Sequence, residues 1–330
     1  MRVITGASGH IGGVLARALV DRYGTGAVRA LFREGRGTAA DLDIEWVRGD
    51  LFDKESLVAA FTGAKTVFHL AALVSLDSGR SKEVHATNVA GTRNVVEVAL
   101  ECGVRRIVHF SSIDAYDHHP IDEVLDESRG PAGPTHDAYN RSKAAGEREV
   151  RRGIDQGLDA VILNPTAVLG PFDGEPSHMG QVFLDLYRRR IPAVIAGGYD
   201  WVDVRDVVEA AVTAEMRAKC GENYILSGHW HTMRELAELS QLATGVAVPR
   251  LQFPLWVARL WAPCQVVLDR WRGRRPLYTP AAVRVMAYGN RQISSAKAQA
   301  ELGFRPRPLA ESVEDTYRWF DEHGMLGEGA

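Results

Sequence analysis

The stretch Val3-Ile4-Thr5-Gly6-Ala7-Ser8-Gly9-His10-Ile11-Gly12 decides the fold of this 330-residue chain. Its first three residues predict a short strand, and the helical periodicity of residues 11–23 predicts a helix directly after the turn. Gly6 permits a tight turn, Gly9 lets the backbone approach a pyrophosphate, and Gly12 lets the helix pack closely on the strand. The N-terminus of that helix would present free N–H groups and a partial positive charge to phosphates. The alternative is a glycine-rich turn without a ligand. The expected cofactor contacts are Gly6, Ser8, Gly9, His10, Ile11 and Gly12.

Beyond this turn, short apolar runs alternate with amphipathic stretches. Strands are predicted at residues 27–32, 44–47, 66–71, 106–110 and 160–163, and helices at 54–61, 86–101 and 138–152. Such alternation predicts an α/β fold with a doubly wound parallel sheet, a Rossmann fold, joined by right-handed crossovers. We therefore expect residues 1–165 to form a dinucleotide-binding domain.

The pattern loosens after Pro165, where residues 170–176 are rich in glycine and proline. Helices are predicted at 181–190, 204–217 and 232–244, and two more within 294–320. Thr232 and Glu235 have the spacing of a capping box at the start of one of these helices. We expect residues 166–330 to form mainly a smaller, mostly helical substrate-binding region, with some segments returning to the Rossmann sheet.

The charge balance does not favour a nucleic-acid partner. The chain has 39 basic and 42 acidic side chains, whereas nucleic-acid binding calls for a clear basic excess. The three cysteines, Cys102, Cys220 and Cys264, are far apart and lack metal-ligand spacing. They predict buried or unreactive thiols, no metal site and a reducing compartment. No signal peptide and no run of about 18 apolar residues is apparent, so we expect a cytoplasmic protein.

The choice between NAD and NADP depends on the end of the second strand. An acidic residue there would bind the ribose 2′-OH of NAD, but this chain has Leu31-Phe32-Arg33. A guanidinium at this place can pair with a 2′-phosphate and stack on adenine, and Arg36 can add to it. We therefore expect NADP(H), with NAD(H) as the alternative, because Glu34 is adjacent and Arg33 can also be a solvated surface charge.

The segment Tyr139-Asn140-Arg141-Ser142-Lys143 supplies the candidate chemistry. Tyr139 and Lys143 are one turn apart on one face of the predicted helix. A tyrosine ordinarily ionises near pH ~10, and a nearby ammonium lowers that pKa. We expect Lys143 to tune Tyr139 and to hydrogen-bond the nicotinamide ribose. Tyr139 would then be the general acid in reduction and the base in oxidation.

Two serines end the strand predicted at 106–110, about 27 residues before Tyr139. Ligands of doubly wound sheets bind at the carboxyl ends of strands. We expect the Ser112 hydroxyl to bind the substrate oxygen. Ser111 remains its rival, and capping of the strand end is the alternative for both.

Together these motifs resemble the extended branch of the short-chain dehydrogenase/reductase superfamily, the NAD-dependent epimerase/dehydratase type. They look most like its dihydroflavonol-reductase-like and 3β-hydroxysteroid-dehydrogenase-like members. The glycine spacing of residues 6–12 is similar to that superfamily's turn, and residues 88–94, 164–171 and 201–207 resemble its later motifs in family order. The four-residue spacing of Ser112 and Tyr116 also resembles the family, although Ala115 and Asp117 depart from its Val-Tyr-Gly pattern.

The resemblance implies further roles. Asp50 would accept from the adenine amino group, or else cap the helix that begins near Lys54. Asn88 would hold the active-site geometry or touch the cofactor, or else be an N-cap. Asp206 would be structural, and His69 a packed strand residue. The cofactor-binding set would also include Leu51, Leu70, Ala71, Ala72, Pro165 and Thr166, and the long helices 86–101 and 138–152 would pair in a homodimer.

The resemblance leaves two reactions open. The first is hydride transfer to a ketone or aldehyde, or from a secondary alcohol, and Arg33 favours it because NADP(H) suits net reduction. The second is epimerisation or dehydration of a nucleotide sugar with tightly bound NAD, which Asp114 favours because sugar dehydratases place an acid there. The loop histidines His118, His119 and His136 can line the cleft or be solvated. A non-catalytic NADP(H) sensor is a third possibility, from a different class.

Residues 251–271 are unusually rich in Trp, Leu and Val for a region expected to cap a substrate. An apolar cap suits an apolar small-molecule substrate. The same segment can instead touch a membrane surface, because Trp and Arg flank its apolar residues. An ordinary buried helix is the alternative.

Overall fold

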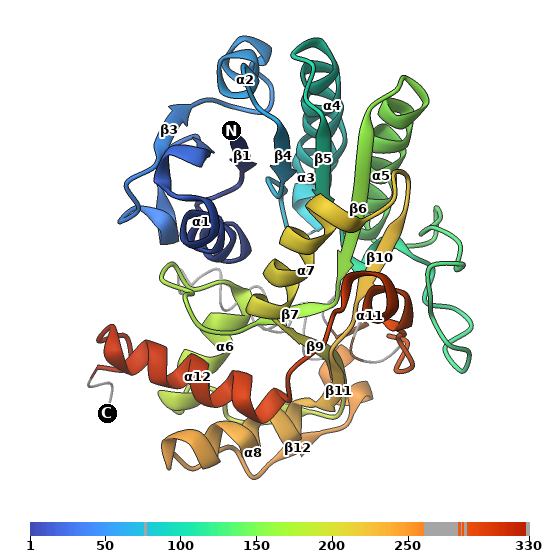
Figure 1. Cartoon of the computed structure of the whole chain (residues 1–330). Helices are drawn as coiled ribbons and strands as arrows, with labels where there is room; N and C mark the ends of the chain where they lie inside the picture. The colour runs from blue at the N-terminus through green and yellow to red at the C-terminus, as the bar shows by residue number, and fades with distance from the viewer. Residues whose placement is uncertain (76–77, 261–282, 285, 287–288, 328–330) are drawn as a thin grey trace.

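The computed structural model describes residues 1–75, 78–260, 283–284, 286 and 289–327. Its central layer is a sheet with the strand order β10-β6-β5-β4-β1-β2-β3 (Figure 1). All of its neighbouring strands are parallel. The strands are β1 (Arg2–Thr5), β2 (Val28–Phe32), β3 (Glu45–Arg48), β4 (Thr66–His69), β5 (Arg106–Phe110), β6 (Asp159–Pro165) and β10 (Asn223–Leu226). The strand order reverses between β1 and β4, which is where doubly wound sheets bind their ligands.

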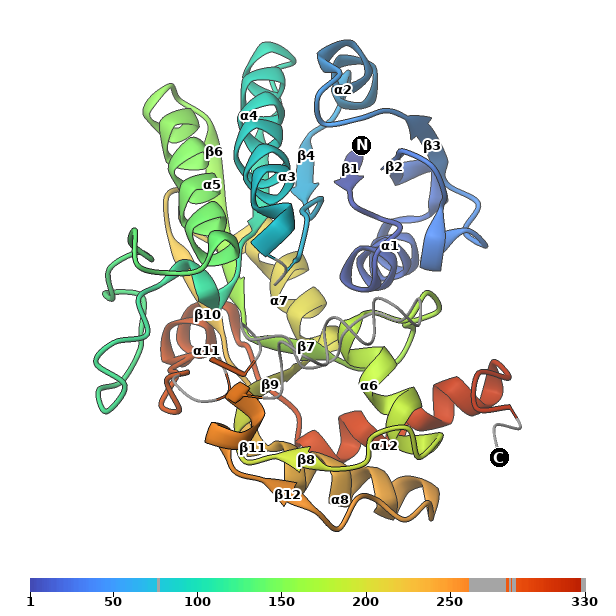
Figure 2. The same cartoon turned by 180° about the vertical axis from the view of Figure 1, so that it is seen from behind.

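Helices cover both faces of this sheet (Figures 1 and 2). One face packs against α1 (His10–Tyr23) and α7 (Val204–Arg217), and the other against α2 (Lys54–Phe61), α4 (Thr92–Glu101) and α5 (Ala138–Asp155). Successive strand residues point to opposite faces, so Val108 joins the first core and Ile107 the second. The predicted doubly wound Rossmann fold is confirmed.

A second group of elements lies beyond α1 and α7 (Figure 1). It contains α6 (His178–Tyr187), α8 (Met233–Thr244) and α12 (Leu309–Glu322), and its core includes Phe183, Trp201 and Phe320. Two small sheets complete it: β11 (His229–Thr232), β9 (Gly198–Asp203) and β7 (Ala167–Leu169) form one, and β12 (Gln252–Phe253) and β8 (Val194–Ile195) the other. Although they follow residue 166, β10, α7 and α11 (Ala296–Leu302) pack with the Rossmann layers.

Three predicted elements differ from the structure. The helix expected at 86–101 begins earlier, because α3 (Ser81–His85) precedes it, and the predicted range itself consists of a π-helical turn at Ala86–Gly91 followed by α4. The strand expected at 66–71 ends at His69, and the Ala71 amide bonds to the Thr5 hydroxyl at 3.3 Å. The helix expected at 181–190 spans 178–187 instead, because Ser177 caps its start and the chain soon afterwards takes a positive φ of 53° at Arg189.

Several finer expectations are confirmed. Thr232 and Glu235 form the predicted capping box of α8, and 294–320 contains two helices. Cys102 is half-buried and Cys220 is exposed; neither is in a disulfide, and Cys264 lies outside the described residues, so the expectation of buried or unreactive thiols stays a prediction. Of the apolar stretch 251–271, the structure describes a strand at 252–253 and a helical segment at 255–260, and 261–271 lies outside the described part.

Candidate active site

The glycine-rich turn of residues 6–12 follows β1 and opens α1, as predicted. Gly6 has a φ of 79°, and a Cβ there would lie 2.7 Å from the Ala71 nitrogen. A Cβ on Gly12 would lie only 2.1 Å from the Gly6 carbonyl oxygen. A Cβ on Gly9 would meet one atom, the Gly6 oxygen, at an ordinary 3.6 Å. The chain itself therefore requires glycine at residues 6 and 12, whereas the space in front of Gly9 remains open for a ligand.

The start of α1 fits an anionic cofactor. Gly9 is its N-cap, no side chain caps the helix, and its first turn carries no acidic residue. The first N–H groups of a helix and its dipole attract phosphate, so the open space at Gly9 and the uncapped helix together fit a pyrophosphate. Ser8, His10 and Ile11 line this end of the helix. His10 Nε2 lies 2.8 Å from the Pro171 carbonyl oxygen and ties the turn to the loop after β7.

The loop after β2 carries the two candidate 2′-phosphate ligands. The Arg33 side chain is 69% exposed, and its Nη1 lies 3.8 Å from Asp50 Oδ2. Arg36 stacks over the rings of Phe32 and Trp46, 5.7 and 5.3 Å from their centroids. Both guanidinium groups therefore lie at the carboxyl edge of β2, where an adenosine ribose is expected.

Gly37 and Thr38 pack this loop against the glycine-rich turn of residues 6–12, a contact that the sequence did not predict. Gly37 has a φ of 55°, and a Cβ there would lie 2.1 Å from the Ser8 carbonyl oxygen. The Thr38 amide donates to that oxygen at 3.3 Å, and its hydroxyl donates to the Gly9 oxygen at 3.0 Å. The glycine after Arg36 was the available signal.

The predicted adenine residue, Asp50, follows β3. Its Oδ1 accepts from the Phe52 amide at 2.9 Å, and Oδ2 faces Arg33. The alternative that Asp50 caps the next helix is wrong, because Asp53 is the N-cap of α2. Leu51 is buried, and its carbonyl accepts from Asn94 at 2.8 Å.

The residues expected along the nicotinamide half lie at the carboxyl ends of β4 and β6. Leu70, Ala71 and Ala72 are half-buried directly after β4, and Gly6 packs on Ala71. Pro165 ends β6. The Thr166 amide donates to the Leu226 carbonyl at 3.2 Å. These strand ends and the glycine-rich turn of residues 6–12 therefore occupy the same edge of the sheet.

Ser112, Tyr139 and Lys143 come together beside the end of β5. All three are buried, with exposed fractions of 8%, 7% and 5%. Tyr139 and Lys143 lie on α5, and Lys143 Nζ donates to the Phe110 carbonyl at 2.9 Å. The Ser112 side chain is a hydrogen-bonding neighbour of the Tyr139 hydroxyl. Ser111, the rival, is buried, and its hydroxyl has no partner among the described residues.

The electrostatics of this group differ from the expectation. Burial, and then the negative charge of Asp114, raise the pKa of Tyr139 above its usual value, against an opposing hydrogen bond with Ser112. The prediction that Lys143 lowers the Tyr139 pKa is therefore wrong, because removal of the phenol from water outweighs any attraction by the ammonium. Burial also lowers the pKa of Lys143 to about 8, although Glu147 and Asp114 oppose that shift.

Asn88 holds the active-site helix in place. It lies within the π-helical turn and not at a helix N-cap, so that alternative is wrong. Its Oδ1 accepts from the Leu73 amide at 2.7 Å, and its Nδ2 donates to Ser142 Oγ at 2.9 Å. Ser142 in turn donates to the Tyr139 carbonyl at 2.7 Å. The extra residue of a π turn often marks a functional site, and here the turn carries the side chain that links α5 to the loop after β4.

A second buried network, which sequence analysis did not find, supports the serine. Asn164 Nδ2 donates to the Ser112 carbonyl at 3.0 Å and to Glu147 Oε1 at 2.7 Å. Asn223 Nδ2 donates to Glu147 Oε2 at 3.1 Å. The signal was present in part, since Tyr139, Lys143 and Glu147 recur at four-residue intervals on one helix face.

Two histidines lie side by side in the sheet behind Lys143. His69 bonds through its ring nitrogens to Thr5 and Thr92, at 2.8 and 3.1 Å, and burial lowers its pKa to about 3. It is therefore the packed strand residue expected. The His109 ring lies 5.2 Å from that of His69, and both of its nitrogens lack a partner among the described residues.

The loop after β5 brings an acid to the site. Asp114 Oδ2 accepts from the Ser112 hydroxyl at 3.3 Å, and His118 Nε2 lies 3.9 Å from Asp114 Oδ1. His136 is bound to Asp117 at 3.2 Å, so it is not simply solvated, whereas His119 is exposed. Of the three loop histidines, only His118 therefore contacts a residue of the candidate site.

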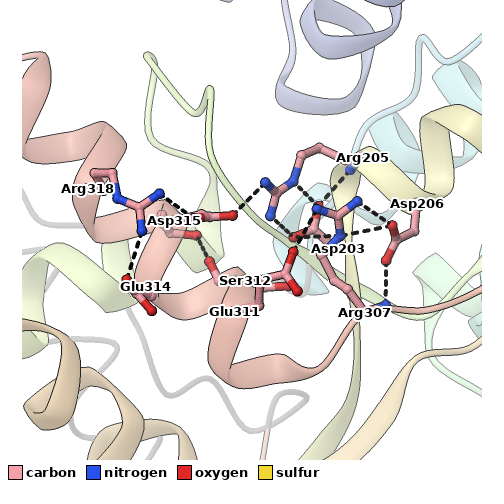
Figure 3. Close-up of polar contacts among 10 residues, drawn as sticks. Asp203, Arg205, Asp206, Arg307, Glu311, Ser312, Glu314, Asp315 and Arg318 are labelled. Carbon is pink, nitrogen blue, oxygen red and sulfur yellow. Dashed lines mark hydrogen bonds and ion pairs between the residues drawn. The ribbon is translucent and has the colours of Figure 1, made fainter.

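Figure 3 shows an ion-pair network that joins the start of α7 to the C-terminal helix. Asp203 caps α7 and accepts from the guanidinium of Arg205, which also donates to Asp315 on α12 at 2.6 Å. Asp206 accepts from the Arg307 amide at 2.8 Å and from its side chain. These carboxylates are therefore occupied in holding α12, in keeping with the structural role expected of Asp206.

The described residues contain no cluster of three or more His, Cys, Asp or Glu side chains that could hold a metal ion. No helix in the described part of the chain is long and apolar enough to cross a membrane.

Comparison with known proteins gives consistent relatives. Sterol demethylase protein B of Methylococcus capsulatus is 35% identical over 329 residues, which cover 98% of this chain and 99% of that protein. The 3beta-hydroxysteroid-dehydrogenase/decarboxylase isoform 1 of Arabidopsis thaliana is 29% identical, over 88% of this chain and 69% of its own. The relatives also include a dihydroflavonol-reductase-like protein, so the predicted resemblance to both groups is confirmed.

The crystal structure of gox2253 has the same fold, with a TM-score of 0.83 and 34% identity over 98% of this chain and 99% of that one. The model of the NAD dependent epimerase/dehydratase family matches residues 2–226. The chain therefore belongs to the NAD-dependent epimerase/dehydratase family, the extended branch of the short-chain dehydrogenases/reductases, and is an NAD(P)-dependent oxidoreductase of that type.

Proposed function

We propose that this enzyme uses NADP(H) to move a hydride to or from the carbonyl carbon of an apolar small molecule, with Tyr139 as the acid or base. The observation that carries the proposal is the buried group of Ser112, Tyr139 and Lys143 beside the end of β5. It lies at the same sheet edge as the uncapped start of α1, which fits the pyrophosphate.

In the reductive direction, the Tyr139 hydroxyl gives its proton to the carbonyl oxygen of the substrate while the Ser112 hydroxyl donates a hydrogen bond to the same oxygen. When bound, the nicotinamide supplies the hydride that completes the reduction. We expect Lys143, one turn further along α5, to hydrogen-bond the nicotinamide ribose. Because burial and Asp114 raise the pKa of Tyr139, the phenol holds its proton until the substrate oxygen takes it. This setting suits the general acid of a reduction.

The preference for NADP(H) rests on Arg33 and Arg36 at the end of β2. Both are cationic, and the Arg36 guanidinium lies 5.7 and 5.3 Å from the ring centroids of Phe32 and Trp46. We expect Arg33→Ser to weaken NADPH binding about tenfold or more and to leave NADH binding within about twofold, because only NADPH carries the 2′-phosphate. Fluorescence titration with each nucleotide measures the two affinities. Arg22→Ser, in the last turn of α1, is the matched control. Equal losses for the two nucleotides would remove Arg33 from the site.

The substrate class follows from the names of relatives together with the chemistry of the site. One relative is named a sterol demethylase protein and another a 3β-hydroxysteroid dehydrogenase/decarboxylase, so apolar ring ketones and secondary alcohols are the first compounds to test. Oxidation of NADPH followed at 340 nm with a sterol 3-ketone, a dihydroflavonol and a nucleotide sugar distinguishes the classes. Turnover of the apolar compounds that disappears in Tyr139→Phe supports the proposal.

A nucleotide-sugar epimerase or dehydratase is the second candidate, and Asp114 is the observation that favours it. Its carboxylate contacts the Ser112 hydroxyl at 3.3 Å, so an acid is present beside the expected substrate oxygen. NAD carried through purification, with conversion of a nucleotide sugar and no net change in nicotinamide absorbance, would support this reaction. NADPH binding without turnover of any of these compounds would instead indicate a cofactor sensor. In that case Tyr139→Phe would bind NADPH as the wild type does.

A further inference from the structure

An apolar surface lies on the second group of elements, at β12 and the segment that follows it. It consists of Leu251, Phe253, Trp256 and Leu260, whose exposed fractions are 62%, 43%, 65% and 73%. Elsewhere in the described chain, large exposed apolar side chains occur singly or, at Ile121 and Val124, as one pair, whereas these four fall within ten consecutive residues. Clustered exposure of this kind marks an interaction surface.

The backbone fixes the direction of these side chains. Strand β12 pairs with β8, so that Phe253 lies opposite Ile195, and the Val194 amide donates to the Leu251 carbonyl at 3.1 Å. The helical segment 255–260 follows Pro254, and the amides of residues 257 and 258 donate to its carbonyl. Trp256 and Leu260 are four residues apart and share one face of that segment.

The opposite face of the helical segment 255–260 packs against the core of the second group of elements. Ala258 is buried in the core that includes Phe183 and Phe320, and Leu255 packs against that core. Trp256 and Leu260 therefore point outward although the segment has apolar residues that satisfy the core. The exposure of Trp256 and Leu260 therefore has no explanation in the packing of the described residues.

Within residues 239–260, which carry this surface, every charged side chain is basic. Arg250 and Arg259 are exposed within the same segment, and residues 239–260 contain no Asp or Glu, although the whole chain is slightly acidic. Arg234 donates to the carbonyls of Pro249 and Arg250, at 2.7 and 3.1 Å, and so adds a third cation beside the strand. Trp, Leu and Phe flanked by Arg are typical of segments that lie in the interface of an anionic bilayer.

A second copy of the chain fits this surface less well. A contact about a two-fold axis would place the arginines of both copies in one interface, to which residues 239–260 bring no acidic partner. Four side chains also fall short of the roughly 800 Å² that each partner buries in a stable dimer. A bilayer with anionic headgroups satisfies the apolar side chains and the arginines together.

From these observations, we infer that the surface of Leu251, Phe253, Trp256 and Leu260, with its flanking arginines, docks the protein on anionic lipid bilayers. This inference does not rest on the proposed function, since docking needs neither cofactor nor substrate. It implies that an apolar substrate can be taken from, or returned to, a lipid phase.

Cosedimentation of the full chain with vesicles tests the inference. The vesicles are phosphatidylcholine alone, or phosphatidylcholine with about a third phosphatidylglycerol. We expect binding to the anionic vesicles that weakens as salt screens the arginines. The double variant Trp256→Ser/Leu260→Ser should lose about tenfold or more in partitioning, and Arg250→Glu about tenfold at low salt. Val124→Ser, which truncates an exposed apolar residue elsewhere, should bind as the wild type does.

Melting curves of each variant confirm that a loss of binding is not a loss of folding. Three results would overturn the inference: no binding of the wild type to anionic vesicles at low salt, equal binding to neutral vesicles, or unchanged vesicle binding in the double variant. If the double variant instead lowers the mass measured by light scattering and leaves vesicle binding unchanged, a second copy is the occupant and the lipid assignment is wrong.

Discussion

Replacement of Gly12 by alanine tests whether this glycine is required by the packing of α1 on the turn, independently of any cofactor. The new Cβ would lie 2.1 Å from the Gly6 oxygen and 2.8 Å from the Ala7 Cα. An ordinary contact needs more than 3 Å, so α1 has to move by about 1 Å relative to the turn. All of the clashing atoms are backbone, so no side-chain rotation relieves the contact.

The expected loss of stability is about 2 kcal/mol. Overpacking by one methyl costs roughly 1–3 kcal/mol, and the upper part of that range applies here because backbone has to shift. The better helix propensity of alanine returns up to about 1 kcal/mol. With an unfolding entropy of about 2.1 cal/mol/K for each of the 330 residues, a loss of 2 kcal/mol lowers Tm by about 3 °C.

Gly9→Ala is the matched control, because its Cβ meets only the Gly6 oxygen at 3.6 Å. We expect its Tm without cofactor to stay within about 1 °C of the wild type, while NADPH binding weakens about tenfold or more because the methyl fills the space in front of the helix N-terminus. Scanning fluorimetry of the cofactor-free proteins and NADPH titrations measure both effects. A Gly12→Ala protein with the Tm and NADPH affinity of the wild type would refute the reasoning, as would a Gly9→Ala protein destabilised to the same extent.

Three further predictions concern the buried site. Tyr139→Phe should lower kcat by about 10² to 10⁴ while NADPH affinity stays within about twofold; steady-state rates and titrations test this, and wild-type turnover would remove Tyr139 from the chemistry. The pKa of Lys143 is about 8 in the folded protein, below its value in the unfolded chain. Protonated Lys143 therefore lowers the free energy of unfolding below pH 8, and this loss of stability disappears as the pH rises from 8 to about 10.5. Lys143→Met should therefore be inactive but up to about 3 kcal/mol more stable than the wild type at pH 7, and this difference in stability should shrink above pH 8. Denaturant unfolding at several pH values measures the difference. A difference that does not change with pH contradicts the burial argument. His109→Phe should raise stability by about 1 kcal/mol, because two unpartnered ring nitrogens leave the core; a destabilised variant would mean that His109 has a partner such as a buried water.

Much of the fold could be read from local pattern. The spacing of Gly6, Gly9 and Gly12 predicted a turn, and the structure shows a steric reason for the first and third of them. The α7 boundaries and the capping box of α8 agree with the sequence because caps and helical periodicity act within a few residues. The π turn at the start of the helix expected at 86–101 was not visible, because Asn88 is held there by Leu73 and Ser142, which are distant in sequence.

The candidate site divides in the same way. Tyr139 and Lys143 were recognisable because one helical turn separates them, and Arg33 because it stands where a strand ends. The direction of the Tyr139 pKa shift was predicted wrongly, since burial and the Asp114 charge depend on what surrounds the phenol and not on its helix neighbour. Gly37 on Ser8 and Asn164 beneath Ser112 were missed for the same reason.

The sequence by itself determined the periodicity, the turns and the identity of the chemical groups, because these depend on interactions between residues a few positions apart. Only the tertiary structure decided which groups meet and how much water they lose. It brings Glu147 to Asn164 and Asn223, closes His10 on Pro171, and exposes Trp256 while it buries Ala258. Contacts of this kind depend on long-range packing of helices on a sheet, and the free energy of removing a charge from water depends on that packing.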